Sequence, residues 1–154
     1  MGNESTNWGQ SVTGVVIKDN KVLLARHTYG DGKGMLIIPG GYVNMNETPQ
    51  NALVREFMEE TKIKINPLSV IGIRFNMHDW YIAFRAEYIA GEPNSDNDEN
   101  SEVLWIDVNE ALSRGDVPQL TKELIRSAIS QDRGLIHKDY QGSNKHAPYS
   151  LYCV

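Results

Sequence analysis

Three glutamates in one short segment constrain this chain more than any other feature. Glu59 and Glu60 follow Glu56 by three and four residues, and residues at these spacings share one face of an α-helix. Like charges repel at this distance, so the cluster costs stability unless a cation lies on it. A hard divalent ion such as Mg²⁺ prefers carboxylate oxygen and keeps positions open for water and substrate phosphate. The cluster therefore predicts a metal-binding helix.

The neighbouring residues predict that this helix runs from Pro49 to Thr61. Thr48 suits the N-cap, because its hydroxyl can accept a hydrogen bond from a free backbone N–H, and proline suits the first helical position. Apolar residues at helical spacing predict a buried side made of Ala52, Leu53 and Phe57.

β-branched and alternating apolar residues predict strands on both sides of this helix. The expected strands cover residues 11–18, 21–27, 35–38, 68–75, 80–89 and 102–106. Two more helices are expected, a short one ending at Leu112 and one capped by Thr121 that buries Leu124, Ile125, Ala128 and Ile129. Strands around one helix, followed by C-terminal helices, predict an α/β fold with helices on the faces of a central mixed β-sheet.

Length and composition predict a single domain over residues 1–154, with a polar N-terminal tail at 1–10 and a C-terminal tail at 134–154. The net charge of −5 argues against a stable nucleic-acid partner. No apolar run approaches the ~20 residues that cross a bilayer, so no membrane association is expected. The single cysteine, Cys153, can form no disulfide within the chain, which favours the cytoplasm. The tail could pack on its own domain or on a second copy in a homodimer.

The glutamates belong to a longer pattern with fixed spacing. The segment Gly41–Ile63 begins with glycine, continues with Glu47 after five residues, and reaches Arg55 after seven more. This pattern resembles the signature of the Nudix hydrolases at every specified position except Lys62, where the family has glycine. The resemblance extends more loosely over residues 11–130, and it implies the Nudix fold, an α/β/α sandwich.

The resemblance also implies an activity. Nudix enzymes hydrolyse the diphosphate bond of a nucleoside diphosphate linked to another moiety, with Mg²⁺ or Mn²⁺ as cofactor. The partner would be a small-molecule substrate: a nucleotide, a nucleotide-sugar or a dinucleotide. By position, the implied metal ligands are the carboxylates of Glu56, Glu59 and Glu60 and the carbonyl of Gly40. Glu59 and Glu60 would also be catalytic, and an ion pair of Arg55 with Glu47 would orient the loop against the helix.

Nudix enzymes often use one more acid from a loop outside this segment. The acidic loop 91–100 is the source of the candidate Glu99, whose spacing to Trp105 is similar to that in the family. Glu102 is the second choice. Glu99 is expected to act in catalysis as a metal ligand or general base, although an acid in such a loop can also serve only as solvated surface.

Three residues are candidates for binding the substrate. Arg26 ends the strand 21–27 and could meet a phosphate or lie as an exposed strand end. Gly41 adjoins the expected metal ligands. Tyr81 could stack on a base, because stacking accepts any base. The proline found in many Nudix enzymes that act on ADP-ribose would fall near Asp79 and is absent, so the leaving group stays open.

Lys62 sets the end of the expected helix. A glycine there normally adopts the left-handed conformation that closes a helix. Lysine in that conformation costs about 1 kcal/mol, unless the helix ends differently.

A second function is possible for the same pattern. A catalytically silent Nudix domain could bind a nucleotide and act as a regulator. The three intact glutamates, Glu56, Glu59 and Glu60, favour the hydrolase.

Overall fold

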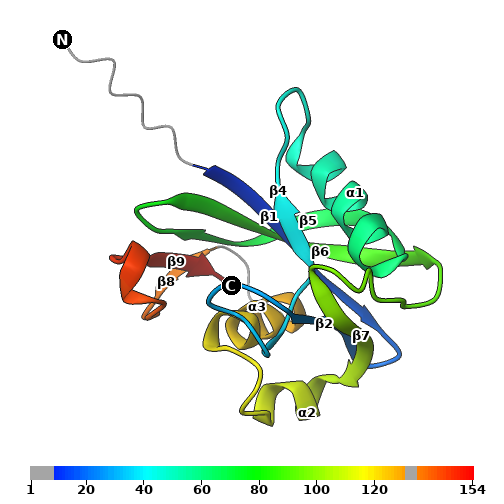
Figure 1. The fold of residues 1–154 in the computed structure, drawn as a ribbon. Coiled ribbons are helices and arrows are strands. Elements are labelled where there is room, and N and C mark those ends of the chain that lie inside the picture. Colours follow the sequence, from blue (N-terminus) through cyan, green and yellow to red (C-terminus); the bar gives the residue numbers. More distant parts are fainter. Residues whose placement is uncertain (1–8, 131–134) are drawn as a thin grey trace.

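The computed structural model describes residues 9–130 and 135–154 (Figure 1). Its strands are β1 (Gly9–Lys18), β2 (Lys21–His27), β3 (Leu36–Ile37), β4 (Gly40–Tyr42), β5 (Lys64–Phe75), β6 (Asp79–Ala90), β7 (Asn100–Asp107), β8 (Ile136–Lys138) and β9 (Ser150–Cys153). Its helices are α1 (Pro49–Thr61), α2 (Val108–Ser113), α3 (Gln119–Ile129) and a 3-10 turn at Asn144–His146. No helix in this described part of the chain is long and apolar enough to cross a membrane.

The strands form one mixed β-sheet. β1 pairs with β6 in parallel, from Gly9 opposite Asp79 to Val16 opposite Ala86, and the other pairings are antiparallel. The strand order is β3-β2-β1-β6-β5-β9-β8, while β4 pairs with β1 and β7 pairs with β2. The mixed sheet that the sequence predicts is confirmed.

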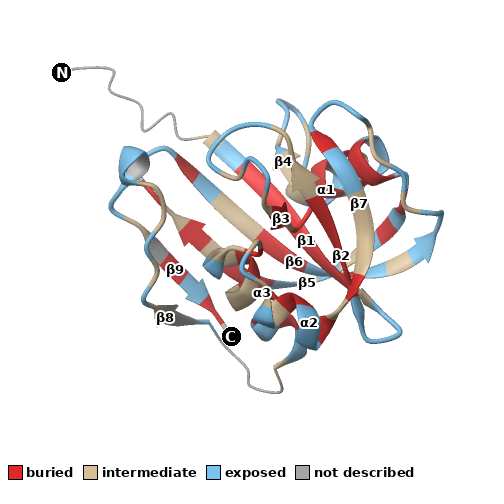
Figure 2. Cartoon of the chain, turned by 60° about the horizontal axis from the view of Figure 1, so that its bottom comes forward, coloured by how far each residue is buried: buried red, intermediate tan, exposed pale blue. Residues whose placement is uncertain are grey.

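Helices cover the two faces of this sheet, with α1 on one side and α2 and α3 on the other (Figure 1). Side chains of β1 alternate between the faces. Val12 and Val16 pack in the cluster that contains Leu53 and Phe57 of α1, and Val15 packs in the cluster that contains Leu124 of α3. Because both faces are covered, most residues of β1 and β2 are buried (Figure 2).

The C-terminal tail carries strands that the sequence does not predict. The sequence predicts no helix or strand within residues 134–154. In the structure, β8 and β9 extend the sheet, and β9 pairs with the segment Gly72–Phe75 of β5. Ser127 fixes the end of the chain, since its hydroxyl donates to the carbonyl of Ile71 at 2.5 Å and accepts from the N–H of Val154 at 2.9 Å. The tail therefore completes one edge of the sheet.

Smaller corrections concern element ends. β5 begins at Lys64, before the predicted start at Leu68, because its first residues pair with the end of β6. α3 begins at Gln119, so Thr121 is a buried helical residue and not the cap. The prediction that Ile129 is buried is wrong: it is 46% exposed, because the last residue of α3 lies on an open pocket.

The end of α1 accommodates lysine in the position of the family's glycine. Lys62 adopts the left-handed conformation, with φ 64° and ψ 16°, and its N–H donates to the carbonyl of Met58. Its Nζ donates to the carbonyl of Glu59 at 3.0 Å, which binds one of the free carbonyls of the last turn. The helix thus ends in the geometry usual for glycine, with a side-chain bond that glycine lacks.

Candidate active site

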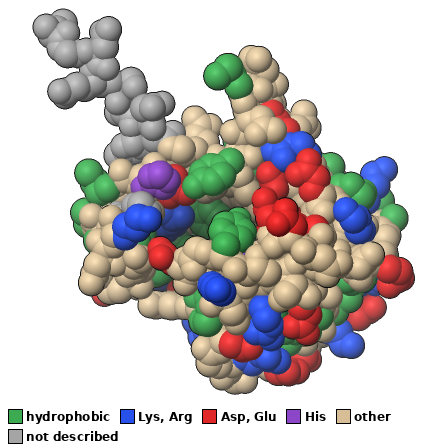
Figure 3. Space-filling view, in the orientation of Figure 1, with side chains coloured by type: hydrophobic (Ala, Val, Ile, Leu, Met, Phe, Trp, Pro, Cys, Tyr) green, Lys and Arg blue, Asp and Glu red, His purple; other side chains and the backbone are tan. Residues whose placement is uncertain are grey.

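Three carboxylates come together where α1 meets the loop before β7. One carboxylate oxygen from each of Glu56, Glu60 and Glu99 lies within 4.8 Å of the others. Glu60 is 4% exposed, whereas Glu99 is exposed, so the cluster has a buried end and an end open to solvent. On the face seen in Figure 3, acidic side chains gather beside a hollowed region that hydrophobic side chains border.

The buried end of this cluster disfavours negative charge. Burial, and then the charges of Glu56 and Glu99, raise the pKa of Glu60 to about 9, while a backbone hydrogen bond from Gly40 acts in the opposite direction. Burial also raises the pKa of Glu56, although Arg55 opposes this rise. Oε2 of Glu60 is buried and has no hydrogen-bond partner among the residues that the structure describes. Carboxylates gathered in this way require a proton or a cation between them.

Two glycines of β4 leave the space that this cluster occupies. A Cβ on Gly41 would lie 2.4 Å from Cδ of Glu56 and 2.6 Å from both its carboxylate oxygens. A Cβ on Gly40 would lie 2.0 Å from the backbone oxygen of Val12 on β1. Gly41 therefore makes room for a carboxylate, and Gly40 allows β4 to pair closely with β1.

Arg55 connects the loop before α1 to the helix. Its Nε donates to Oε2 of Glu47 at 2.8 Å, and its Nη2 donates to Oε1 of the same residue at 2.9 Å. Nη2 also donates to the carbonyl of Tyr42, and Nη1 donates to Glu56 at 2.7 Å. The bond from Arg55 holds the pKa of Glu47 down, to about 2. Such a bidentate pair fixes orientation as well as supplying energy.

Glu59 lies beside the cluster and not within it. Its side chain is 59% exposed, and its carboxylate is 3.3 Å from Nη1 of Arg55. The three carboxylates that the structure brings together are those of Glu56, Glu60 and Glu99.

Hydrogen bonds hold the loop that carries Glu99 against α1. Nδ2 of Asn100 donates to the backbone carbonyl of Glu60 at 2.9 Å. From the other side, the hydroxyl of Thr28 donates to the carbonyl of Asp98 at 2.6 Å, and its N–H donates to the carbonyl of Glu99 at 3.2 Å. Glu99, the acid predicted from its spacing to Trp105, thus lies in a loop segment that hydrogen bonds hold on both sides.

The remaining predicted substrate residues differ in their surroundings. Arg26 donates to Glu102 at 2.9 Å, to Asp116 at 3.2 Å and to the carbonyl of Gly34 at 2.9 Å, so its guanidinium is already engaged. Tyr81 lines a hollow on the α3 side of the sheet.

That hollow and an adjoining one form a cleft that we call the Arg74 cleft. Their volumes are about 400 and 270 Å³. Both are lined by Asp31, Arg74, Tyr140 and Ser143, and further walls come from His27, Ile37, Tyr81, Leu120, Tyr42, Asp79 and Tyr149. Arg74 is 8% exposed, and its Nη1 donates to Asp79 at 2.6 Å.

The Arg74 cleft adjoins the carboxylate cluster. Tyr42 lines the cleft and directly follows Gly41, which abuts Glu56. His27 also lines it and stacks on Tyr29, with ring centroids 5.6 Å apart. Burial, and then the charge of Glu99, raise the pKa of Tyr29.

Sequence reasoning missed the residues that make this cleft. Arg74 falls in a strand predicted from apolar residues, and a lone charge in such a strand is the one signal that could have drawn attention to it. The tyrosines Tyr140 and Tyr149 lie in the tail, where no period is visible. Their role depends on the pairing of β9 with β5, which no local pattern encodes.

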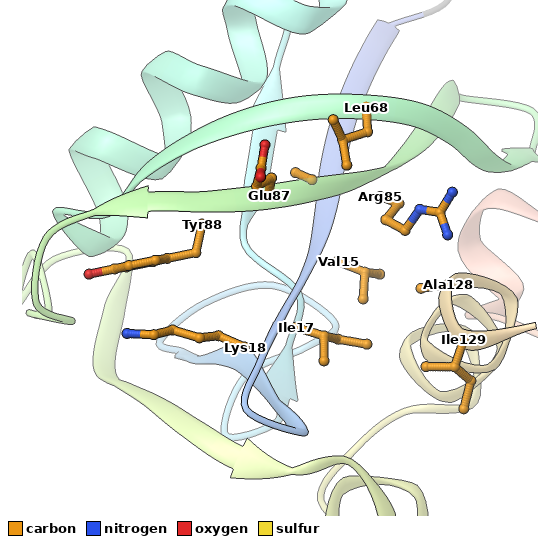
Figure 4. Close-up of a pocket in the computed structure, with 10 residues that line it drawn as sticks. Val15, Ile17, Lys18, Leu68, Arg85, Glu87, Tyr88, Ala128 and Ile129 are labelled. Atoms are coloured by element: carbon orange, nitrogen blue, oxygen red, sulfur yellow. The ribbon is translucent and has the colours of Figure 1, made fainter.

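A separate pocket of about 430 Å³ lies between β1, β6 and α3. Figure 4 shows Val15, Ile17 and Ile129 around it, with Lys18 beside Tyr88. Nζ of Lys18 lies 4.1 Å from the ring centroid of Tyr88. None of the three clustered carboxylates lines this pocket, so its location does not connect it with their chemistry.

Comparison with known proteins gives a family match. The model of the NUDIX domain matches residues 8–127. The ADP-ribose pyrophosphatase of Methanocaldococcus jannaschii is 33% identical over 105 residues, covering 64% of this chain and 62% of that protein. The NAD-capped RNA hydrolase NudC of Vibrio atlanticus is 29% identical over 124 residues, covering 77% and 44%. The chain thus spans about half the length of the curated relatives it matches.

Solved structures share the fold. A NUDIX hydrolase from Nitrosomonas europaea superposes with a TM-score of 0.67 at 20% identity, over 78% of this chain and 87% of that one. The MutT protein from Methanosarcina mazei Go1 gives a TM-score of 0.66 at 22% identity, over 77% and 91%. At these identities the likeness concerns the fold alone.

Proposed function

The chain belongs to the Nudix family, and from this premise we propose that it is a metal-dependent hydrolase of a nucleoside diphosphate linked to another moiety. The convergence of Glu56, Glu60 and Glu99, with a buried carboxylate oxygen that no described residue pairs, is the observation that carries the proposal. The family match over residues 8–127 supports the same reaction class.

The residues present fit a divalent metal ion. The donor set consists of carboxylate oxygens, which Mg²⁺ and Mn²⁺ prefer, and the orphaned oxygen of Glu60 is a group that a cation would satisfy. We assign Glu56, Glu60 and Glu99 to hold the metal, with Glu59 and the carbonyl of Gly40 beside them. A bound ion would supply positive charge to the diphosphate oxygens as negative charge develops on them.

The proposed reaction cleaves one bridging P–O bond. A water oxygen forms a bond to one phosphorus, the bridging oxygen leaves with the other phosphate, and the attacking water loses a proton. We assign the acceptance of this proton to Glu99, because it is the exposed member of the cluster and is open to water. The ion pair of Arg55 and Glu47 holds the loop before α1 against the helix. We assign it an orienting role, because phosphoryl transfer depends mainly on positioning and electrostatics.

A hydrolysis screen tests this proposal. Wild type and Glu60→Gln would be incubated with ADP-ribose, dinucleotides and nucleotide-sugars, with Mg²⁺ or Mn²⁺, and the phosphate products separated and identified. We expect Glu60→Gln to lower turnover at least about 100-fold, since the metal contributes several kcal/mol to the transition state. Glu87→Gln, an exposed glutamate of β6 outside the cluster, is the matched control and should retain activity.

Other outcomes would change the assignment. Equal turnover by Glu60→Gln and wild type would remove Glu60 from the metal site. Turnover that persists after dialysis against EDTA would contradict metal dependence. Tight binding of a nucleotide without hydrolysis of any substrate would favour the alternative function, a silent domain that acts as a regulator.

A further inference from the structure

The acid Glu99 lies in a turn of residues 95–100 that is closed by its own hydrogen bonds. Oδ1 of Asp96 accepts from the N–H of Asp98 at 2.9 Å and from the N–H of Asn100 at 3.0 Å. Both bonds begin and end within the turn. They fix its shape, but they do not fix its position relative to the two carboxylates of α1.

A β-bulge determines how this turn leaves the sheet. β2 and β7 pair residue by residue as far as Arg26. The next pair is His27 with Asn100, so Ser101 is an extra residue of β7 with no counterpart on β2. Bulges re-aim side chains and are common next to active sites. This one lets the backbone of Thr28 reach the carbonyl of the residue before Asn100.

Thr28 holds the turn on both sides of the α-carbon of Glu99. The hydroxyl of Thr28 donates to the carbonyl of Asp98 at 2.6 Å, and its N–H donates to the carbonyl of Glu99 at 3.2 Å. These two carbonyls belong to the peptide groups before and after the α-carbon of Glu99. Bonds to both peptide groups restrict the direction in which the Glu99 side chain leaves the backbone.

Backbone hydrogen bonds also hold the residue before Thr28. The N–H of His27 donates to the carbonyl of Met35 at 3.0 Å, and its carbonyl accepts from the N–H of Gly34 at 2.9 Å. The ring of His27 stacks on Tyr29, with centroids 5.6 Å apart. A group that is itself held in place can position a reactive side chain, and Thr28 meets this condition.

We propose that Thr28 is a positioning residue for Glu99, and that its hydroxyl keeps the Glu99 carboxylate where it can accept the proton of the attacking water. The inference rests on the proposed function, which assigns that proton to Glu99. The backbone bond of Thr28 persists in every side-chain variant, so loss of the hydroxyl should displace the carboxylate without releasing the turn. A displacement of about 1 Å can lower a rate about 100-fold.

Two substitutions of Thr28 test the hydroxyl. Thr28→Val keeps the β-branched shape and removes the hydroxyl, whereas Thr28→Ser keeps the hydroxyl. The substrate is the diphosphate that wild type cleaves fastest, at saturating Mn²⁺. We expect Thr28→Val to lower kcat about tenfold and to leave KM within about twofold, because substrate binding is untouched. Thr28→Ser should stay within about threefold of the wild-type kcat, since serine differs mainly in its rotamer freedom.

A double-mutant cycle shows whether Thr28 acts through Glu99. Glu99→Gln removes the proton acceptor, so adding Thr28→Val should lower kcat by less than about twofold more. A general loss of structure would lower kcat by the same factor in both backgrounds. Ser113→Ala is the matched control, because the hydroxyl of Ser113 also donates to a backbone carbonyl, that of Glu110 on α2, at 2.9 Å. It should turn over as wild type does.

Binding of Mn²⁺ gives a readout that needs no turnover. Glu99 is also assigned to hold the metal, so Thr28→Val should weaken Mn²⁺ binding about tenfold, measured by electron paramagnetic resonance. Thr28→Ser should restore most of this affinity, and Ser113→Ala should bind Mn²⁺ as wild type does. Circular dichroism would confirm that each variant is folded.

The results separate this inference from the proposed function. Wild-type kcat and Mn²⁺ affinity in Thr28→Val would overturn the positioning role even if the protein hydrolyses diphosphates. Equal losses of kcat from Thr28→Val with and without Glu99→Gln would overturn it as well. If wild type cleaves no diphosphate, the proposed hydrolysis fails and Mn²⁺ affinity decides. A loss in Thr28→Val that serine restores would then retain the positioning of Glu99, and unchanged affinity would overturn it.

Discussion

Asn100 donates a hydrogen bond through Nδ2 to the backbone carbonyl of Glu60 at 2.9 Å. The bond joins the residue after Glu99 to the residue that forms the buried end of the carboxylate cluster. Asn100 is 1% exposed, so water does not compete for this contact. The bond ties together the two elements that carry Glu60 and Glu99, so we expect Asn100 to be a positioning residue for these carboxylates.

Replacing Asn100 with alanine should therefore weaken metal binding. We expect affinity for Mn²⁺, measured by electron paramagnetic resonance, to fall about 10–100-fold, the usual effect of losing a group that orients a ligand. The unfolding free energy should change little, because the buried carbonyl of Glu60 loses its donor while the buried Oδ1 of Asn100, which has no partner among the described residues, is removed as well. Asn66→Ala, at an exposed position of β5, serves as the control. Unchanged Mn²⁺ affinity in Asn100→Ala would rule out the positioning role.

The two glycines of β4 should respond differently to alanine. In Gly41→Ala, the new Cβ meets the carboxylate end of the Glu56 side chain, so the carboxylate must move, and metal affinity and turnover should fall at least about tenfold with a smaller loss of stability than a clash with backbone causes. In Gly40→Ala, the Cβ meets the backbone of Val12, so urea denaturation should show a loss of about 1–3 kcal/mol or more. Identical stability losses in both variants would contradict this division.

The pair of Glu47 with Arg55 predicts a pH dependence of stability. The pKa of Glu47 falls from 4.5 to about 2 on folding. Its stabilising contribution is therefore complete above pH 4.5 and is lost as the pH falls toward 2. The difference in melting temperature between wild type and Glu47→Gln should be largest above pH 4.5 and vanish near pH 2. A constant difference across this range would show that the carboxylate charge is not responsible.

A substitution at Lys62, the left-handed residue that ends α1, should stabilise the folded protein. Lys62→Gly should raise the unfolding free energy by less than about 1 kcal/mol, because glycine adopts φ 64° without steric cost but loses the exposed bond from Nζ to the carbonyl of Glu59. Turnover should not change, since the metal ligands are untouched. Lys64→Gly, two residues later in β5, should instead lower stability, because glycine weakens a strand. Chemical denaturation of both variants checks the opposite signs.

Sequence alone predicts the parts of this protein whose signals are local. α1 has the predicted bounds, and its cap forms as expected, with the hydroxyl of Thr48 accepting from the N–H of Asn51. The spacing of Glu47 and Arg55 places them within reach because loop and helix are contiguous. β-branched and apolar residues likewise locate β1 and β2, and hydrophobic alternation locates β6; these strands are neighbours in the sheet.

The rest depends on contacts between distant segments. β9 becomes a strand only because the edge of β5 is available to pair with it. Arg74 tolerates burial because Asp79, across the turn into β6, accepts from it. Such pairings carry no periodic pattern, so the sequence does not show the Arg74 cleft or the position of Tyr140 and Tyr149 in its lining. The catalytic and substrate roles assigned by resemblance, the domain limits, the cytoplasmic location and the homodimer stay predictions.

The position of Cys153 gives the tail an internal reporter. It is the only cysteine of the chain, it is fully buried, and it lies on β9, opposite Gly72 of β5. A thiol-reactive dye should therefore reach the sulfur when β9 separates from β5. The labelling rate of the native protein therefore reports how often the tail that carries Tyr140 and Tyr149 opens, with no engineered probe. A ligand that occupies the cleft and holds the tail in place would slow the labelling.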